Sequence, residues 1–63
     1  MSIVERFSKI YPKAKVYWNG NINQLSLHFN ENINEQSIRT RVYKELSFCN
    51  LLNAVNSIRI LSY

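Results

Sequence analysis

Apolar and polar residues alternate along two neighbouring runs within residues 13–30, and this alternation is the clearest structural signal in the chain. Asn19, Gly20 and Asn21 stand between the runs, and an Asn-Gly pair in that position is typical of a β-hairpin. One side of the two strands carries the apolar residues Ala14, Val16, Trp18, Leu25, Leu27 and Phe29. Other segments must cover this side, because an isolated hairpin is at most marginally stable in water.

The length of the connecting loop decides which residues face each other across the hairpin. A two-residue turn at Asn19 and Gly20 would pair the apolar Val16 with the polar Asn23. A four-residue loop over residues 19–22 would place Val16 opposite Leu25 and Ala14 opposite Leu27. We expect the four-residue loop, because a buried face specifies the register of a strand strongly.

A short helix is predicted ahead of the hairpin, over residues 3–11. Ser2 and Glu5 have the spacing of a capping box, in which each side chain bonds a backbone N–H at the start of the helix. The apolar residues Ile3, Phe7 and Ile10 follow at helical spacing and form one stripe. Pro12 ends the helix, because the residue before a proline is pushed out of the helical region.

A longer helix is predicted from Glu35, with Asn32 as its cap or Asn34 as a competing cap. Its apolar stripe consists of Ile38, Val42, Leu46, Cys49 and Leu52. The helix has four to five turns by this pattern, and its end is open because Asn50, Asn53 and Asn56 are all suitable stop residues.

The C-terminal residues 57–63 alternate again and are rich in residues that favour strands, which predicts a third strand. The alternative is a further helix over residues 51–61, since short apolar runs are ambiguous by periodicity. The predicted fold is a small single α+β domain in the order helix-strand-strand-helix-strand. Both helices then pack on one face of a sheet built around the antiparallel hairpin.

A chain of 63 residues has a small core, and proteins of this size often add a disulfide, a metal or a partner subunit. Cys49 and His28 are the single cysteine and the single histidine, so they form neither an intrachain disulfide nor a four-ligand zinc site. We therefore expect no cofactor and no metal, and self-association through an exposed strand edge stays open as a source of stability. A lone thiol fits a reducing compartment.

The N-terminal residues carry charges that interrupt any secretory signal, and no apolar run approaches the length of a membrane span, so we expect a cytoplasmic protein without a membrane partner. The net charge is +4. This balance favours phosphate-bearing or acidic partners. Frequent Asn, Ile, Ser and Tyr residues are typical of AT-rich genomes, including those of many phages.

The sheet face opposite the helices would carry Lys15, Tyr17, Ser26, His28, Arg59 and Tyr63. Aromatic rings can stack on nucleobases while neighbouring cations contact phosphates, as in sheet platforms that bind single strands. The competing interpretation is an ordinary solvated strand face, on which Tyr and Lys are common.

A second basic cluster, Arg39, Arg41 and Lys44, lies on the longer helix, with Arg41 and Lys44 as neighbours one turn apart and Arg39 on a flank. A helix that reads a DNA groove would look similar, but so would a solvated helix face. Trp18 faces inward by strand parity, which favours a core position, although tryptophan near a hairpin tip also suits a binding anchor.

His28 could act as a general base in a ribonuclease-like toxin, which is a third hypothesis, but the only carboxylates near it in sequence are Glu31 and Glu35. Cys49 lies on an apolar stripe without a histidine at suitable spacing, so we expect it to be a small core residue. The first hypothesis is therefore a non-enzymatic interaction protein that inhibits or regulates a larger protein or complex by covering its surface. A phage or a mobile element is the origin that this hypothesis includes. The alternative is a small basic nucleic-acid-binding protein. The candidate partner-binding residues are Lys15, Tyr17, Trp18, His28, Arg39, Arg41, Lys44, Arg59 and Tyr63.

Overall fold

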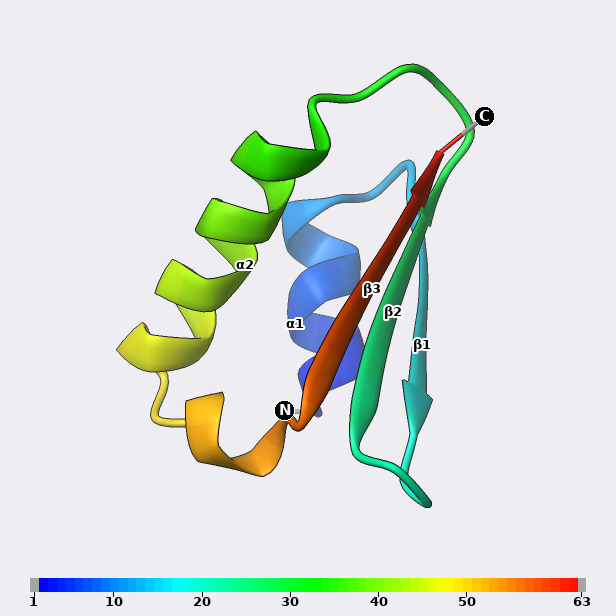
Figure 1. The fold of residues 1–63 in the computed structure, drawn as a ribbon. Coiled ribbons are helices and arrows are strands. Elements are labelled where there is room, and N and C mark those ends of the chain that lie inside the picture. Colours follow the sequence, from blue (N-terminus) through cyan, green and yellow to red (C-terminus); the bar gives the residue numbers. More distant parts are fainter. Residues whose placement is uncertain (1, 63) are drawn as a thin grey trace.

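Two helices lie against one face of a three-stranded sheet (Figure 1). The computed structural model describes residues 2–62. The elements are α1 (Ile3–Ile10), β1 (Lys15–Asn19), β2 (Gln24–Phe29), α2 (Glu35–Phe48), a 3₁₀ turn η1 (Leu52–Ala54) and β3 (Ser57–Ser62). The predicted α+β order of helix, strand, strand, helix and strand is confirmed.

The sheet has the order β1-β2-β3, so β2 is the central strand. The hairpin strands β1 and β2 are antiparallel, whereas β3 runs parallel to β2. The parallel pairing follows from α2, which carries the chain back to the starting end of β2, as a crossover helix does. The predicted C-terminal strand is confirmed over Ser57–Ser62, and Tyr63 lies outside the described residues.

The register of the hairpin differs from the prediction. The structure pairs Val16 with Leu27 and Trp18 with Leu25, so the expected pairing of Val16 with Leu25 is wrong by two residues. Ala14 precedes β1 and does not face Leu27. Since the side chains of a strand alternate with a period of two, this shift leaves the same residues on the apolar face.

The loop itself explains the shift. It has the expected four residues, but they are residues 20–23, one position later than predicted. The Asn19 side chain accepts a hydrogen bond from the Asn21 backbone N–H at 3.0 Å, which makes a turn that asparagine commonly stabilises. Asn23 adopts the left-handed conformation, with φ of 51°, and returns the chain directly into β2.

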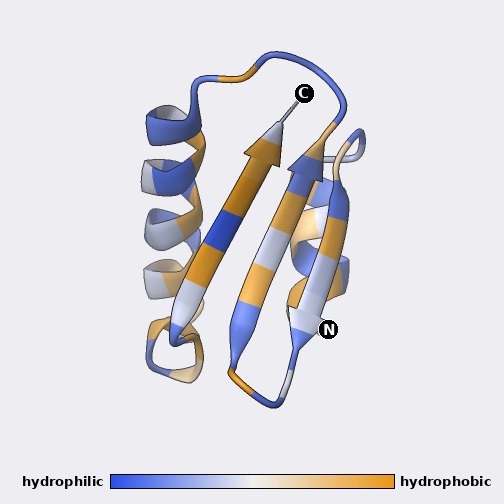
Figure 2. Cartoon of the chain, turned by 45° about the vertical axis from the view of Figure 1, so that its right-hand side comes forward, coloured by the Kyte–Doolittle hydropathy of each residue, from blue (hydrophilic) through white to orange (hydrophobic). Residues whose placement is uncertain are grey.

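The core lies between the sheet and the helices. Its buried residues are Phe7, Leu25, Leu27, Phe29, Val42, Leu46, Ile58 and Ile60. The strand members all belong to one side of the sheet, and Figure 2 shows the resulting alternation of hydrophobic and hydrophilic residues along the strands. Trp18 is half-buried and packs against this core, as its strand parity predicts.

The N-terminal helix begins as predicted. The Ser2 hydroxyl accepts a hydrogen bond from the Glu5 backbone N–H at 3.1 Å. Helix α1 ends at Ile10, with Tyr11 as the cap residue, because Pro12 follows. Its stripe is confirmed, with Phe7 buried and the two flanking isoleucines half-buried against the core.

Helix α2 begins at Glu35 as predicted, but its cap is Asn34 and not Asn32. The Asn34 side chain accepts from the Ser37 backbone N–H at 3.1 Å. Asn34 lies directly before the first helical residue, which is the position from which a side chain can reach the free N–H groups of the first turn.

Among the three candidate stop residues, Asn50 ends α2. It has a left-handed φ of 60°, and the Leu51 N–H donates to the Leu46 carbonyl at 2.8 Å, the bond of a Schellman motif. The predicted extension of the stripe is therefore wrong beyond Leu46. Cys49 is a half-buried cap residue, and Leu52 lies in η1 with 39% of its surface exposed.

The cap of α2 gives a direct test of these boundaries. Asn34→Ala should lower the free energy of unfolding by about 1 kcal/mol, because a backbone N–H loses its partner. Asn32→Ala is the matched control and should leave stability within about 0.5 kcal/mol of the wild type. Urea unfolding followed by circular dichroism measures both, and equal losses in the two variants would contradict the assignment of the cap.

Candidate functional site

The second face of the sheet is left uncovered by both helices. In Figure 2, α1 lies behind the strands and no described element lies in front of them. Its side chains come from alternate positions of the three strands and are Lys15, Tyr17, Asn19, Gln24, Ser26, His28, Ser57, Arg59 and Leu61. We call this set the open face.

The strand registers arrange the open face in rows across the sheet. One row runs from Tyr17 through Ser26 to Arg59, and the next runs from Lys15 through His28 to Leu61. Each of these rows contains a cation and a ring. The third row, from Asn19 through Gln24 to Ser57, is polar and uncharged, with Gln24 bonded to Ser57 at 3.2 Å.

Two rings on the open face touch each other. The centroids of Tyr17 and His28, diagonal neighbours on β1 and β2, are 4.9 Å apart, and the rings are tilted by 57°. Tyr17 keeps 49% of its surface exposed. The ring pair is a ready surface for another flat, unsaturated group.

Shallow depressions lie on both sides of the ring pair, and Tyr17 and His28 line both of them. One, of about 310 Å³, also includes Ser26 and Arg59. The other, of about 300 Å³, also includes Lys13 and Lys15. Each side of the ring pair therefore has its own positive charge.

Within residues 2–62, the cations of the open face have no ion-pair partner. None of the three strands contains an aspartate or glutamate. Within residues 2–62 the ion pairs are Arg6 with Glu45 and Arg39 with Glu35, all on helices. Lys15 and Arg59 are consequently free to attract an anion.

The structure brings together four of the predicted site residues, namely Lys15, Tyr17, His28 and Arg59. Trp18 packs against the core from the other side of β1, but it also contributes to the lining of the depression that contains Arg59. Tyr63 lies outside the described residues. Lys13 was not among the predicted site residues although it lines a depression on the open face. The alternation that selected Lys15 already pointed to Lys13, two positions earlier.

Arg39 is used inside the fold. Its Nη1 donates to the Ile58 backbone carbonyl at 3.1 Å, and its Nη2 lies 3.6 Å from the Glu35 carboxylate. The first contact ties α2 to β3, and the second lies within α2. A similar tie joins the two helices, because Arg6 Nε donates to Glu45 Oε1 at 2.9 Å.

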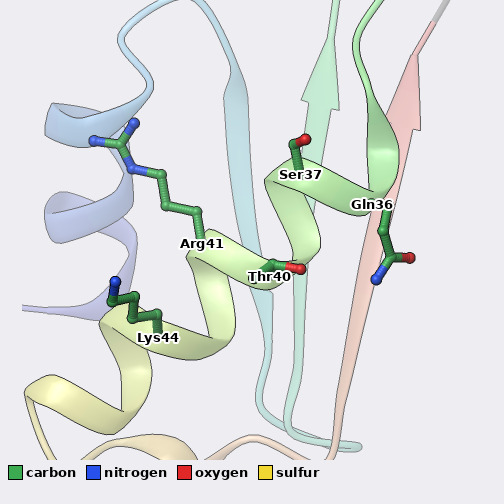
Figure 3. Close-up of a pocket in the computed structure, with 5 residues that line it drawn as sticks. All are labelled: Gln36, Ser37, Thr40, Arg41 and Lys44. Carbon is green, nitrogen blue, oxygen red and sulfur yellow. The ribbon is translucent and has the colours of Figure 1, made fainter.

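Arg41 and Lys44, the other members of the predicted basic cluster, form a separate surface on α2. Figure 3 shows both side chains extending to the same side of the helix. With Gln36, Ser37 and Thr40 they line a shallow hollow of about 500 Å³. We call these five residues the helix surface.

The Tyr11 ring packs beneath the guanidinium group of Arg41, one of the five residues of the helix surface. The Arg41 guanidinium carbon lies 5.7 Å from the centre of the Tyr11 ring, a cation–π distance, and the ring meets Phe29 edge-on at 5.5 Å. Among the described residues, the Tyr11 hydroxyl is buried without a hydrogen-bond partner. Burial raises the pKa of Tyr11 above its ordinary value, Arg41 opposes this, and Glu45 adds to it.

Within residues 2–62, no hydrogen bond or ion pair joins His28 or Cys49 to an acidic or basic side chain. His28 lies among Lys15, Leu61 and Tyr17, without a strand carboxylate to orient it. Cys49 lies at the end of α2, with its sulfur 3.7 Å from the Leu46 carbonyl. Residues 2–62 contain no cluster of three or more His, Cys, Asp or Glu side chains arranged to hold a metal ion.

Comparisons of the chain with protein-family models, with curated proteins and with solved structures find no match. In the part of the chain that the structure describes, the helices are also too short and too polar to cross a membrane. Function must therefore be inferred from the open face and the helix surface themselves.

The buried hydroxyl of Tyr11 predicts a pH dependence of stability. The fold favours the neutral phenol of Tyr11, because the pKa of Tyr11 is higher in the folded than in the unfolded state. The free energy of unfolding should therefore fall as the pH rises above about 10, where the phenol ionises more readily in the unfolded chain. Tyr11→Phe should therefore lose less stability than the wild type between about pH 9 and pH 11. Tyr43→Phe, which removes an exposed hydroxyl, is the control in urea titrations at each pH, and equal slopes for all three proteins would refute the expectation.

Proposed function

We propose that the protein is a small, non-enzymatic binding protein that holds single-stranded nucleic acid on the open face. The observation that carries this proposal is the Tyr17–His28 ring pair, which stands between two depressions with cations on both sides. A nucleic-acid strand presents flat bases along a sugar–phosphate backbone, and the open face offers rings with cations beside them.

Stacking would supply the contact with the bases. Every base has a π face, so a base can lie on an exposed ring whatever its identity, and such contacts are worth about 1–3 kcal/mol each. Tyr17 is the natural partner because about half of its surface is free. His28 adjoins it, which extends the stacking area from β1 onto β2.

Phosphate contacts would come from Lys15 and Lys13 on one side of the rings and from Arg59 on the other. Adjacent strands are about 4.8 Å apart, so the distance from β1 to β3 is about 10 Å. That span suits a short site of about two or three nucleotides, comparable with other sheet platforms that stack bases.

Single strands suit this surface better than duplex DNA. Bases are accessible to a ring only when they are unpaired. No described helix projects from the open face, so this face lacks the helix with which many proteins enter a major groove.

Loss of the ring tests the stacking contact. Tyr17→Thr keeps a strand-favouring residue but should weaken binding to a short labelled oligonucleotide at least about fivefold, the equivalent of about 1 kcal/mol. Tyr43 has a similar exposure of 44% but lies on α2, so Tyr43→Ala is the matched control and should bind normally. Fluorescence anisotropy measures both affinities. Equal affinities for the two variants would exclude the stacking platform.

The salt dependence tests the phosphate contacts. Binding of the wild-type protein should weaken steeply as salt rises, because cations that contact phosphate release counterions. Arg59→Gln should reduce the slope of log K against log salt by about 0.7, the value for one phosphate contact on a single strand. A slope near zero for the wild-type protein would show that phosphate contact is not the basis of binding.

The first hypothesis from the sequence was that the protein covers the surface of a partner protein. Exposed apolar residues at the end of α2 and in η1 support this second candidate function. Phe48 at the end of α2 is 81% exposed, and Leu52 in η1 is 39% exposed. Strand β1 also forms an outer edge of the sheet, where another chain could pair with it. These features are typical of protein-binding surfaces and are separate from the open face.

A protein partner held at this end of the molecule would depend on Phe48. Phe48→Ser should abolish capture of such a partner in an affinity experiment and leave the urea midpoint almost unchanged, because the ring buries little surface. Tyr17→Thr is the control and should retain the partner. Capture that is lost in Tyr17→Thr and kept in Phe48→Ser would contradict the proposed location.

A further inference from the structure

The helix surface is a second place where positive charge is left free. Of the five cations on α1 and α2, Arg6 and Arg39 are held by Glu45 and Glu35, and Lys9 lies on α1, outside the helix surface. Arg41 and Lys44 have no ion-pair partner within residues 2–62. The nearest acidic residue in sequence, Glu45, already binds Arg6.

The lining of the helix surface is chemically suited to phosphate. All five of its residues have hydrogen-bond donors, and none is acidic. Arg41 is held over the Tyr11 ring, so its guanidinium has less freedom to lose when an anion binds. Gln36, Thr40 and Lys44 recur every four residues, which places donors along about 12 Å of the helix.

The helix surface and the open face point in opposite directions. Val42 and Leu46 are buried and mark the side of α2 that faces the sheet. Thr40 and Lys44 are each two positions from Val42, which puts them about 160° around the helix from it. The open face lies beyond the other side of the same sheet, so a short, straight segment of nucleic acid cannot lie on both surfaces.

From these observations we infer that the helix surface binds the phosphate backbone of a second nucleic-acid segment, so that one molecule bridges two segments. This inference rests on the proposed function for the open face. The two surfaces have different roles, because the open face has rings for stacking, whereas none of the five residues of the helix surface is aromatic and these residues contact phosphates alone.

Energy transfer between two short single-stranded oligonucleotides, one with a donor dye and one with an acceptor dye, tests the bridge. At low salt and with the oligonucleotides in excess, the wild-type protein should produce energy transfer. Arg41→Gln/Lys44→Gln should lose this signal but keep its anisotropy-measured affinity for one oligonucleotide within about threefold. Urea midpoints near that of the wild type verify that the variants are folded.

A variant with the same loss of charge separates the two surfaces. Lys15→Gln/Arg59→Gln should lower the affinity for one oligonucleotide at least tenfold, which the helix-surface variant should not do. Absence of any binding by the wild-type protein would overturn the proposed function, and the bridge with it. Binding of one oligonucleotide without energy transfer would overturn the bridge alone. Energy transfer that persists in Arg41→Gln/Lys44→Gln, as in a dimer that joins two open faces, would overturn it as well.

Discussion

The central strand β2 is the element on which the structure depends, because it has a neighbour on each side and two faces of opposite character. Leu25, Leu27 and Phe29 are buried beneath the helices, and the residues between them face outward. Burial of these three side chains fixes which side of β1 and β3 faces the core. The composition of the open face is a consequence of that choice, since any side chain paired beside Ser26 or His28 must point outward.

The few carboxylates of the chain shape the distribution of positive charge. Two of the four acidic residues, Glu35 and Glu45, hold arginines at the joints between helix and strand or between helix and helix. These contacts are partly exposed, so each contributes little to stability. Their larger effect is on where unpaired positive charge lies. They neutralise the arginines between the elements, whereas the cations of the open face and the helix surface have no ion-pair partner within residues 2–62.

Periodicity was sufficient to predict the two helices, the three strands and the buried side of each strand, but not the end of the α2 stripe or the turn η1. It was not sufficient to predict the register, since a shift of two residues keeps every side chain on the same side. The ring pair depends on that register. With the expected loop, His28 would stand opposite Lys13 and out of reach of Tyr17, whereas the observed pairing makes the two rings diagonal neighbours.

The candidate site was predicted in part for similar reasons. Alternation identified Lys15, Tyr17, His28 and Arg59 as members of one face, and the structure places them together. Periodicity could not show that Arg39 bonds the Ile58 carbonyl, because that partner is 19 residues away.

The parallel pairing of β2 with β3 has a consequence for how the chain folds during synthesis. The row partners Gln24 and Ser57 are 33 residues apart, whereas the two strands of the hairpin are adjacent in sequence. A ribosome therefore releases the hairpin well before the strand that completes the sheet, and loops of that length close later than a hairpin forms. During this interval the edge of β2 is open to other chains, so a newly made molecule is most vulnerable to mispairing along its own central strand.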